Sequence, residues 1–269
     1  MIVQLFYFTS TGNTEYLVKE AQKYLIETGN TVSVGEINKQ IKFSEEAELT
    51  GVFYPVWSSD LPSPVKGFLM NEKELNERKI FLIGNCAVFS GDTGKNFKRE
   101  FEEKTDNTVI FADSIKMPSN VNIPGFERFK VNEEKKKSII EASKEKLRQM
   151  LDKILAGEIF IEGSNPIKSL GGKLQRKISK TSFSGFNAQL NVDYEKCKEC
   201  HNCYKICPVS NIHINDDNSI FFGDECIFCL SCYNLCPEDA INLGEKTKDT
   251  EKYKRYKGPD GNFTHSFYR

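Results

Sequence analysis

Five continuous apolar runs alternate with amphipathic stretches over residues 1–156. The runs, each expected to form a buried strand, cover residues 2–8, 31–37, 50–56, 79–84 and 108–114. Continuous apolar strands separated by helices predict a parallel sheet that is covered on both faces. Five such strands in one domain predict an α/β fold with a doubly wound, five-stranded parallel sheet.

Apolar residues between these runs recur at helical spacing. Leu17, Ala21 and Leu25 share one face of a helix that is expected to begin near Asn13. Phe97 and Phe101 share a face of a second predicted helix. Helices of this kind supply the covering layers that a buried parallel sheet requires.

The pattern changes after residue 156. A long charged helix is predicted over residues 133–155 and ends at Ala156-Gly157, a common helix stop. Residues 157–192 are predicted as a basic linker, because 163–192 hold five basic residues and no acid, with one short helix around 173–180. Residues 193–243 form a cysteine-rich domain. The tail, 244–269, is too aromatic for a disordered segment and is expected to pack on the body.

Length and charge narrow the class of protein. The chain has 269 residues, which suits two domains. Its 37 basic and 38 acidic residues give a net charge of −1, which argues against a general nucleic-acid binder. No apolar run approaches the roughly 18 residues of a membrane span, and no basic region of a signal peptide precedes the first strand. We therefore expect a cytoplasmic protein without a membrane span.

Eight of the nine cysteines lie within 40 residues, in two copies of the pattern C-x2-C-x2-C-x3-C-P that are offset by 29 positions. A disulfide scaffold would suit a small secreted protein, whereas here a long cysteine-poor segment precedes the cluster. Structural zinc is a second alternative, but zinc sites use two cysteine pairs separated by a longer stretch. Metal ligation by an iron–sulfur centre explains the spacing best. Ile212–Ile214 and Ile220–Phe222, which lie between the copies, predict a hairpin.

The pattern is that of bacterial ferredoxins with two [4Fe–4S] clusters, in which the fourth cysteine of each run serves the other cluster. The predicted ligands of one cluster are Cys197, Cys200, Cys203 and Cys236. The predicted ligands of the other are Cys226, Cys229, Cys232 and Cys207. His201 and His213 are not needed as ligands. Nine acids and three lysines give residues 193–243 a charge of −6, which serves solubility or steers basic redox partners.

Three loops that follow predicted strands form a candidate cofactor site. The first, Thr9-Ser10-Thr11-Gly12-Asn13-Thr14, leads into a helix and offers hydroxyls and backbone N–H groups to a phosphate. Open α/β sheets bind ligands at the carboxyl ends of their strands, so the other two loops are expected to flank a flat aromatic ligand. Their candidate residues are Pro55, Val56, Trp57, Ser58, Gly84, Asn85, Cys86, Phe89, Gly91 and Asp92. Trp57 and Phe89 could equally be packing residues.

The segment Phe8–Thr14 resembles the FMN-phosphate loop of flavodoxins. Tyr54-Pro55-Val56-Trp57, Met117-Pro118-Ser119-Asn120 and Arg255-Tyr256 are further matching segments. The order of a flavodoxin-like domain, a basic linker and a small α+β dicluster ferredoxin domain resembles the flavodoxin–ferredoxin fusion proteins of anaerobes. This resemblance implies FMN, two [4Fe–4S] clusters and electron transfer. The loop 84–92 departs from many flavodoxins because it lacks their ring-stacking Tyr.

Two function classes follow. The first is an electron-transfer protein or oxidoreductase that passes electrons between FMN, the clusters and other redox proteins, such as ferredoxin-dependent or hydrogenase-type enzymes. The second is a redox-regulated adaptor or enzyme-complex subunit whose flavodoxin-like domain no longer binds FMN. No catalytic nucleophile constellation is visible. Cys86 is read as a small hydrophobe, with a redox or flavin-contacting thiol as the alternative.

Overall fold

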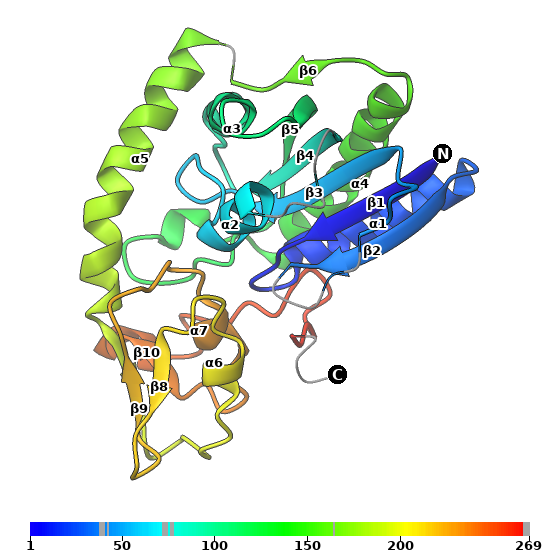
Figure 1. The fold of residues 1–269 in the computed structure, drawn as a ribbon. Coiled ribbons are helices and arrows are strands. Elements are labelled where there is room, and N and C mark those ends of the chain that lie inside the picture. Colours follow the sequence, from blue (N-terminus) through cyan, green and yellow to red (C-terminus); the bar gives the residue numbers. More distant parts are fainter. Residues whose placement is uncertain (38–40, 42, 72–74, 76–77, 164, 266–269) are drawn as a thin grey trace. The chain divides into compact units, whose positions relative to one another are not determined.

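The computed structural model (Figure 1) describes residues 1–265 except 38–40, 42, 72–74, 76–77 and 164, and omits the side chains of 180–184, 186 and 187. Contacts divide the chain into two compact units. The first unit comprises Met1–Thr9, Asn13–Pro118 and Glu133–Lys177. The second comprises Ser10–Gly12, Ser119–Asn132 and Ile178–Arg269. The second unit therefore takes up two short segments from within the sequence of the first.

The first unit is built on a parallel sheet with the strand order β2-β1-β3-β4-β5-β6. The strands are β1 (Ile2–Tyr7), β2 (Thr31–Glu36), β3 (Leu49–Pro55), β4 (Lys79–Cys86), β5 (Thr108–Lys116) and β6 (Phe160–Ile161). The order 2-1-3-4-5 is that of the flavodoxin-like doubly wound fold, so the predicted fold class is confirmed. The sixth strand was not predicted, because its two residues are too few to produce a readable pattern.

Helices cover both faces of this sheet. They are α1 (Asn13–Glu27), α2 (Ser63–Asn71), α3 (Thr93–Glu102) and α4 (Glu133–Leu155). Leu17 of α1 and Leu147 of α4 share one buried cluster, and Leu69 of α2 and Phe97 of α3 share the other. Successive side chains of a strand point to opposite faces, and the strands contribute to both clusters accordingly.

The stretch predicted as a linker forms α5 (Pro166–Asn187), which is a helix of 22 residues and not a short one. Glycine and serine suggested irregular structure, but two adjacent glycines allow close packing within the first unit. A Cβ on Gly172 would lie 2.0 Å from Oδ1 of Asp92, and one on Gly171 would lie 3.1 Å from the Phe89 ring. Tertiary contacts therefore stabilise a helix that composition alone disfavours.

The second unit contains two small antiparallel sheets. β7 (Leu190–Val192) pairs with β10 (Ile241–Leu243), and β8 (Ile212–Ile214) pairs with β9 (Ile220–Phe222) as the predicted hairpin. Two short helices, α6 (Asn202–Lys205) and α7 (Ser231–Leu235), accompany these sheets. The tail adds the 3-10 turn η3 (Glu245–Lys248), and Tyr253 is buried. A second 3-10 turn, η2 (Glu127–Phe129), belongs to the inserted segment.

Among the described residues, none of the helices combines the length and the apolar character that crossing a membrane requires.

Candidate functional site

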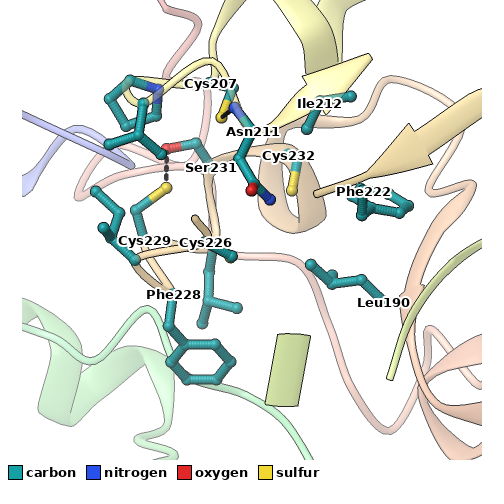
Figure 2. A pocket seen from close by; sticks show the side chains of 14 residues that line it. Leu190, Cys207, Asn211, Ile212, Phe222, Cys226, Phe228, Cys229, Ser231 and Cys232 are labelled. Atoms are coloured by element: carbon teal, nitrogen blue, oxygen red, sulfur yellow. Dashed lines mark hydrogen bonds between the residues drawn. The ribbon is translucent and has the colours of Figure 1, made fainter. Parts of the chain in front are cut away.

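Four cysteines line a cavity in the second unit (Figure 2). They are Cys226, Cys229 and Cys232 of the second repeat together with Cys207 of the first. The cavity encloses about 440 Å³ of empty space, part of it open to solvent, and its remaining lining is largely apolar, including Leu190, Ile212 and Phe222. An apolar lining with thiols as its chief ligands suits an iron–sulfur cluster.

A second cavity collects the complementary set of cysteines. Cys197, Cys200 and Cys203 of the first repeat line it together with Cys236 of the second. It holds about 380 Å³ of empty space. The structure therefore brings together each of the two predicted ligand sets, including the fourth cysteine taken from the other repeat.

The sequence repeat is also a repeat of backbone conformation. Left-handed residues occur at Glu199, His201 and Ser210, and again 29 positions later at Phe228, Leu230 and Asp239. In each copy a backbone N–H donates to the sulfur of the fourth cysteine: Asn211 to Cys207 at 3.1 Å and Ala240 to Cys236 at 3.3 Å. None of the six left-handed residues is glycine, so the sequence contained no signal for these turns. N–H donation to thiolate sulfur is one of the features that set cluster potential.

Burial controls the protonation of the cavity thiols. It raises the pKa of Cys229 to about 12 and that of Cys203 to about 11, because a thiolate would lose its solvation there. Iron binds thiolate, so cluster assembly must release the protons of these thiols. Both cysteine sites therefore fit a cofactor that supplies compensating positive charge.

A short hydrogen-bonded chain starts at Cys229. Its Sγ lies 3.4 Å from the hydroxyl of Ser231, and that hydroxyl donates to the carbonyl oxygen of Ser10 at 3.0 Å (Figure 2 shows the first link). Cys229, Ser231 and Ser10 all belong to the second unit. A cysteine of one cavity is thus connected to the tip of the predicted phosphate loop. Sequence reasoning missed Ser231, because 221 residues separate it from Ser10.

The predicted phosphate loop is buried and tightly held. Thr9, Ser10, Thr11 and Thr14 are each at most 4% exposed. Gly12 has a φ of +97°, and a Cβ on it would lie 2.7 Å from the Phe263 ring. The loop combines hydroxyls, a left-handed glycine and the N-terminus of α1, and residues 9–14 include no carboxylate, which is the chemistry expected of a phosphate-binding loop.

The structure brings the three predicted loops together. The amide of Asn85 donates to Oγ1 of Thr14 at 2.7 Å and to the carbonyl of Tyr54 at 3.0 Å. A side chain on Gly91 would lie 2.2 Å from Oγ of Ser59. The loops after β1, β3 and β4 therefore meet at the carboxyl edge of the sheet, where α/β folds of this type bind ligands.

The loop after β3 makes a two-residue turn. Trp57 and Asp60 exchange backbone hydrogen bonds of 3.0 and 2.9 Å, and Ser58 and Ser59 between them are both left-handed, with φ of 52° and 59°. Trp57 is half-buried and packs edge-on against Phe8, with ring centroids 5.7 Å apart. Two non-glycine residues in this conformation are strained, as residues at functional sites often are.

Cys86 is the last residue of β4, and the loop that follows it holds Asp92. Burial raises the pKa of Cys86 to about 11, so its thiol is protonated at neutral pH. Asp92 is tied to α5: Nη1 of Arg176 donates to Oδ1 at 2.6 Å and to the carbonyl of Ser59 at 2.7 Å. Arg176 was predicted only as a basic linker residue, yet it joins two of the candidate cofactor loops.

Both the cysteine-rich domain and the α/β part of the chain are similar to known proteins. Residues 189–237 match the family described as the 4Fe-4S dicluster domain. This match confirms the predicted pair of clusters. It begins four residues before the predicted start of the domain at residue 193. No curated protein matches the chain. Solved flavodoxin structures are similar to somewhat more than half of the chain. One of them is the two-electron reduced flavodoxin of Megasphaera elsdenii, which is 22% identical, with 53% of this chain and 98% of that chain covered and a TM-score of 0.38.

Two further structures are similar. The flavodoxin of Fusobacterium nucleatum bound to flavin mononucleotide is 15% identical, with 58% of this chain and 97% of that chain covered and a TM-score of 0.39. The rubredoxin oxygen:oxidoreductase of Desulfovibrio gigas is 19% identical, with 56% and 37% covered and a TM-score of 0.35. The present chain thus corresponds to only part of the Desulfovibrio gigas protein.

Proposed function

Because the chain combines a flavodoxin-like fold with a 4Fe-4S dicluster domain, as flavodoxin–ferredoxin fusions do, we propose that it carries electrons between FMN, its two clusters and other redox proteins. A dicluster domain supports a role in electron transfer by itself. Bound FMN supplies a centre that takes up one or two electrons, which complements one-electron clusters.

One observation carries this proposal. The hydroxyl of Ser231 bridges Cys229 and the carbonyl of Ser10, with separations of 3.4 and 3.0 Å. Cys229 is a proposed cluster ligand and Ser10 a proposed phosphate-loop residue. The same serine therefore contacts one proposed cluster ligand and one residue of the proposed phosphate loop, both within the second unit.

The residues proposed to hold FMN divide by chemistry. Thr9–Thr14 would bind the phosphate through backbone N–H groups and hydroxyls. Trp57 and Phe89 would offer aromatic surface to the ring, with Cys86 and Asp92 in the same segment as Phe89. Asn85 would hold the three loops together through its hydrogen bonds to Thr14 and to the carbonyl of Tyr54.

The eight clustered cysteines are the proposed iron ligands, in the crossed sets that line the two cavities. Left-handed residues flank the second cysteine of each run, and the N–H groups of Asn211 and Ala240 orient the sulfur of the fourth. We infer a basic surface on the redox partners, because residues 193–243 carry a charge of −6.

A specific contact favours one second candidate, an adaptor whose flavodoxin-like domain does not bind FMN. Arg176 joins the carbonyl of Ser59 to the carboxylate of Asp92, and these groups lie in the two loops proposed to flank the ring. The contact restricts the space for a ring at that end.

The experiment that separates the two functions is cofactor analysis of anaerobically purified full-length protein. The carrier predicts eight irons, matching acid-labile sulfide, flavin absorbance and much tighter binding of FMN than of riboflavin, which lacks the phosphate. Thr11→Asp should abolish FMN binding by charge repulsion, whereas the nearly isosteric Thr11→Asn should retain most of it. Equal affinity for FMN and riboflavin would contradict the phosphate site. Clusters without any flavin affinity would favour the adaptor.

A further inference from the structure

The first half of α5 presents its polar side to the fold. Oγ of Ser169 donates to Asp92 at 3.1 Å, and Ser59 donates to the side-chain oxygen of Gln175 at 2.6 Å. Arg176 adds its paired bonds to Asp92, and Gly172 packs against the same carboxylate. All these residues belong to the first unit.

The opposite side of the same helix is apolar and open. Ile167, Leu170 and Leu174 follow the three- and four-residue spacing of one helix face, and they are 81%, 71% and 58% exposed. A surface helix normally buries its apolar stripe and exposes its polar side. Here the arrangement is inverted, and a contiguous apolar stripe of this kind marks an interaction surface.

Lysine is the charged residue beside this stripe. Lys173 and Lys177 are exposed and, being three residues from Leu170 and Leu174 respectively, lie next to them on the helix. Neither forms an ion pair among the residues that the structure describes. Residues 163–192 contain five basic residues and no acid. The partner of this surface must therefore be apolar at its centre and anionic around it.

We propose that the exposed face of α5 docks on the surface of an anionic lipid membrane. An interfacial helix inserts an apolar face into the boundary of the acyl chains while its basic residues contact the headgroups. Lys173 and Lys177 can extend their alkyl stems along the lipid and keep their ammonium groups in water. The polar side of α5 remains bound to the fold and needs no rearrangement.

Two other occupants fit less well. A second copy of the chain would bring the lysines of both stripes together, and two or three helical turns bury far less than the roughly 1,200 Å² of a stable interface. A groove on another protein would be expected to meet aromatic residues and arginine, because lysine is depleted at protein interfaces. The aliphatic side chains of the stripe suit the acyl chains of a lipid, and the neighbouring lysines suit its anionic headgroups.

Vesicle binding by the full-length, cluster-loaded protein tests the proposal. The wild type should co-sediment with vesicles of mixed phosphatidylglycerol and phosphatidylcholine, bind weakly to phosphatidylcholine alone, and lose affinity as salt rises. Leu170→Glu/Leu174→Glu should lower the partition coefficient by about 100-fold, and Lys173→Glu/Lys177→Glu by about tenfold or more. The matched control is Ile159→Glu, which alters another exposed aliphatic residue (78%) outside α5 and should retain binding.

Cluster absorbance checks that every variant is folded and loaded. Failure of the wild type to bind anionic vesicles would overturn the proposal, as would equal losses in the α5 and Ile159 variants. A dimer seen by sedimentation velocity that disappears in Leu170→Glu/Leu174→Glu would also overturn it, because the stripe would then bind a second copy.

Discussion

Replacing Arg176 with methionine should weaken the packing of the first half of α5 on the rest of the first unit. The guanidinium donates to both carboxylate oxygens of Asp92, at 2.6 and 3.2 Å, and to the carbonyl of Ser59 at 2.7 Å. Its side chain is 15% exposed and that of Asp92 is 5% exposed. Methionine retains much of the apolar stem and leaves the carboxylate without its cation.

The magnitude follows from burial. Removing one partner of a buried ion pair costs about 3–5 kcal/mol, because the remaining charge loses its compensation. Asp92 keeps the hydrogen bond from Ser169, and water can approach the partly exposed position 176, so we expect the lower end, about 3 kcal/mol. Opening of α5 should then become about 100-fold more frequent, since each 1.4 kcal/mol is tenfold.

Amide hydrogen exchange of peptides from α5 measures this opening directly. The matched control is Lys168→Met on the same helix. Its pair with Glu162 is 2.9 Å long, but the lysine is 46% exposed, so its loss should cost less than about 1 kcal/mol. Equal exchange in the two variants would refute the reasoning, as would full additivity of Arg176→Met and Asp92→Asn in a double-mutant cycle.

The same contact predicts a pH dependence. Burial alone would raise the pKa of Asp92, but the hydrogen bonds and charge of Arg176 outweigh it and hold the pKa below its ordinary value. A carboxyl with a depressed folded-state pKa stabilises the fold above its unfolded pKa, near 3.9. Protection of α5 should therefore be constant at neutral pH and fall once the pH drops below about 4, whereas Asp92→Asn should remove this acid dependence.

Three further predictions concern the cysteines and the tail. Cys207→Ser should impair the cluster bound by the second repeat and leave that of the first, as resolved by iron content and electron paramagnetic resonance; damage confined to the first repeat's cluster would contradict crossed ligation. Arg255→Met should lower the free energy of unfolding by about 2 kcal/mol or more, seen as a lower denaturant midpoint for cluster bleaching. The buried guanidinium of Arg255 lies 3.7 Å from the centroid of the Tyr233 ring and donates to the Ile241 carbonyl at 3.0 Å. An unchanged midpoint would show that this contact of the tail contributes nothing to stability. Cys86, with its pKa raised to about 11 by burial, should react slowly with iodoacetamide at neutral pH and about tenfold faster per pH unit until that pKa; rapid reaction at pH 7 would show an activated thiol.

The sequence predicted the parts of the molecule whose signals are local. Central parallel strands are buried on both faces, so β1, β3 and β4 are continuous apolar runs that differ from the predicted ranges by at most two residues at either end. The paired cysteine runs encode their chemistry in spacing alone, and the dicluster match confirms it.

The remaining features depend on contacts that spacing does not reveal. The glycine, serine and asparagine content of residues 163–192 predicts a linker, although Ile167, Leu170 and Leu174 have helical spacing. The polar side of α5 packs on Asp92, a contact that the sequence does not reveal. The contact between Arg176 and Asp92 spans 84 residues, and that between Ser231 and Ser10 spans 221. Contacts between residues so distant in sequence cannot be predicted from a single sequence.

The composition of the second unit has a consequence for synthesis on the ribosome. Its inserted segment Ser119–Asn132 supplies the carbonyl oxygens of Asn120 and Asn122, which accept hydrogen bonds from Asn234 and Tyr233. These donors are translated 114 and 111 residues later, a delay of about 5 to 20 seconds at ordinary elongation rates. During that interval the nascent α/β domain must keep a segment of its own sequence free for a partner that does not yet exist. Because Cys236 is a proposed ligand in the cavity of Cys197, Cys200 and Cys203, that cluster cannot be completed before residue 236 has been translated.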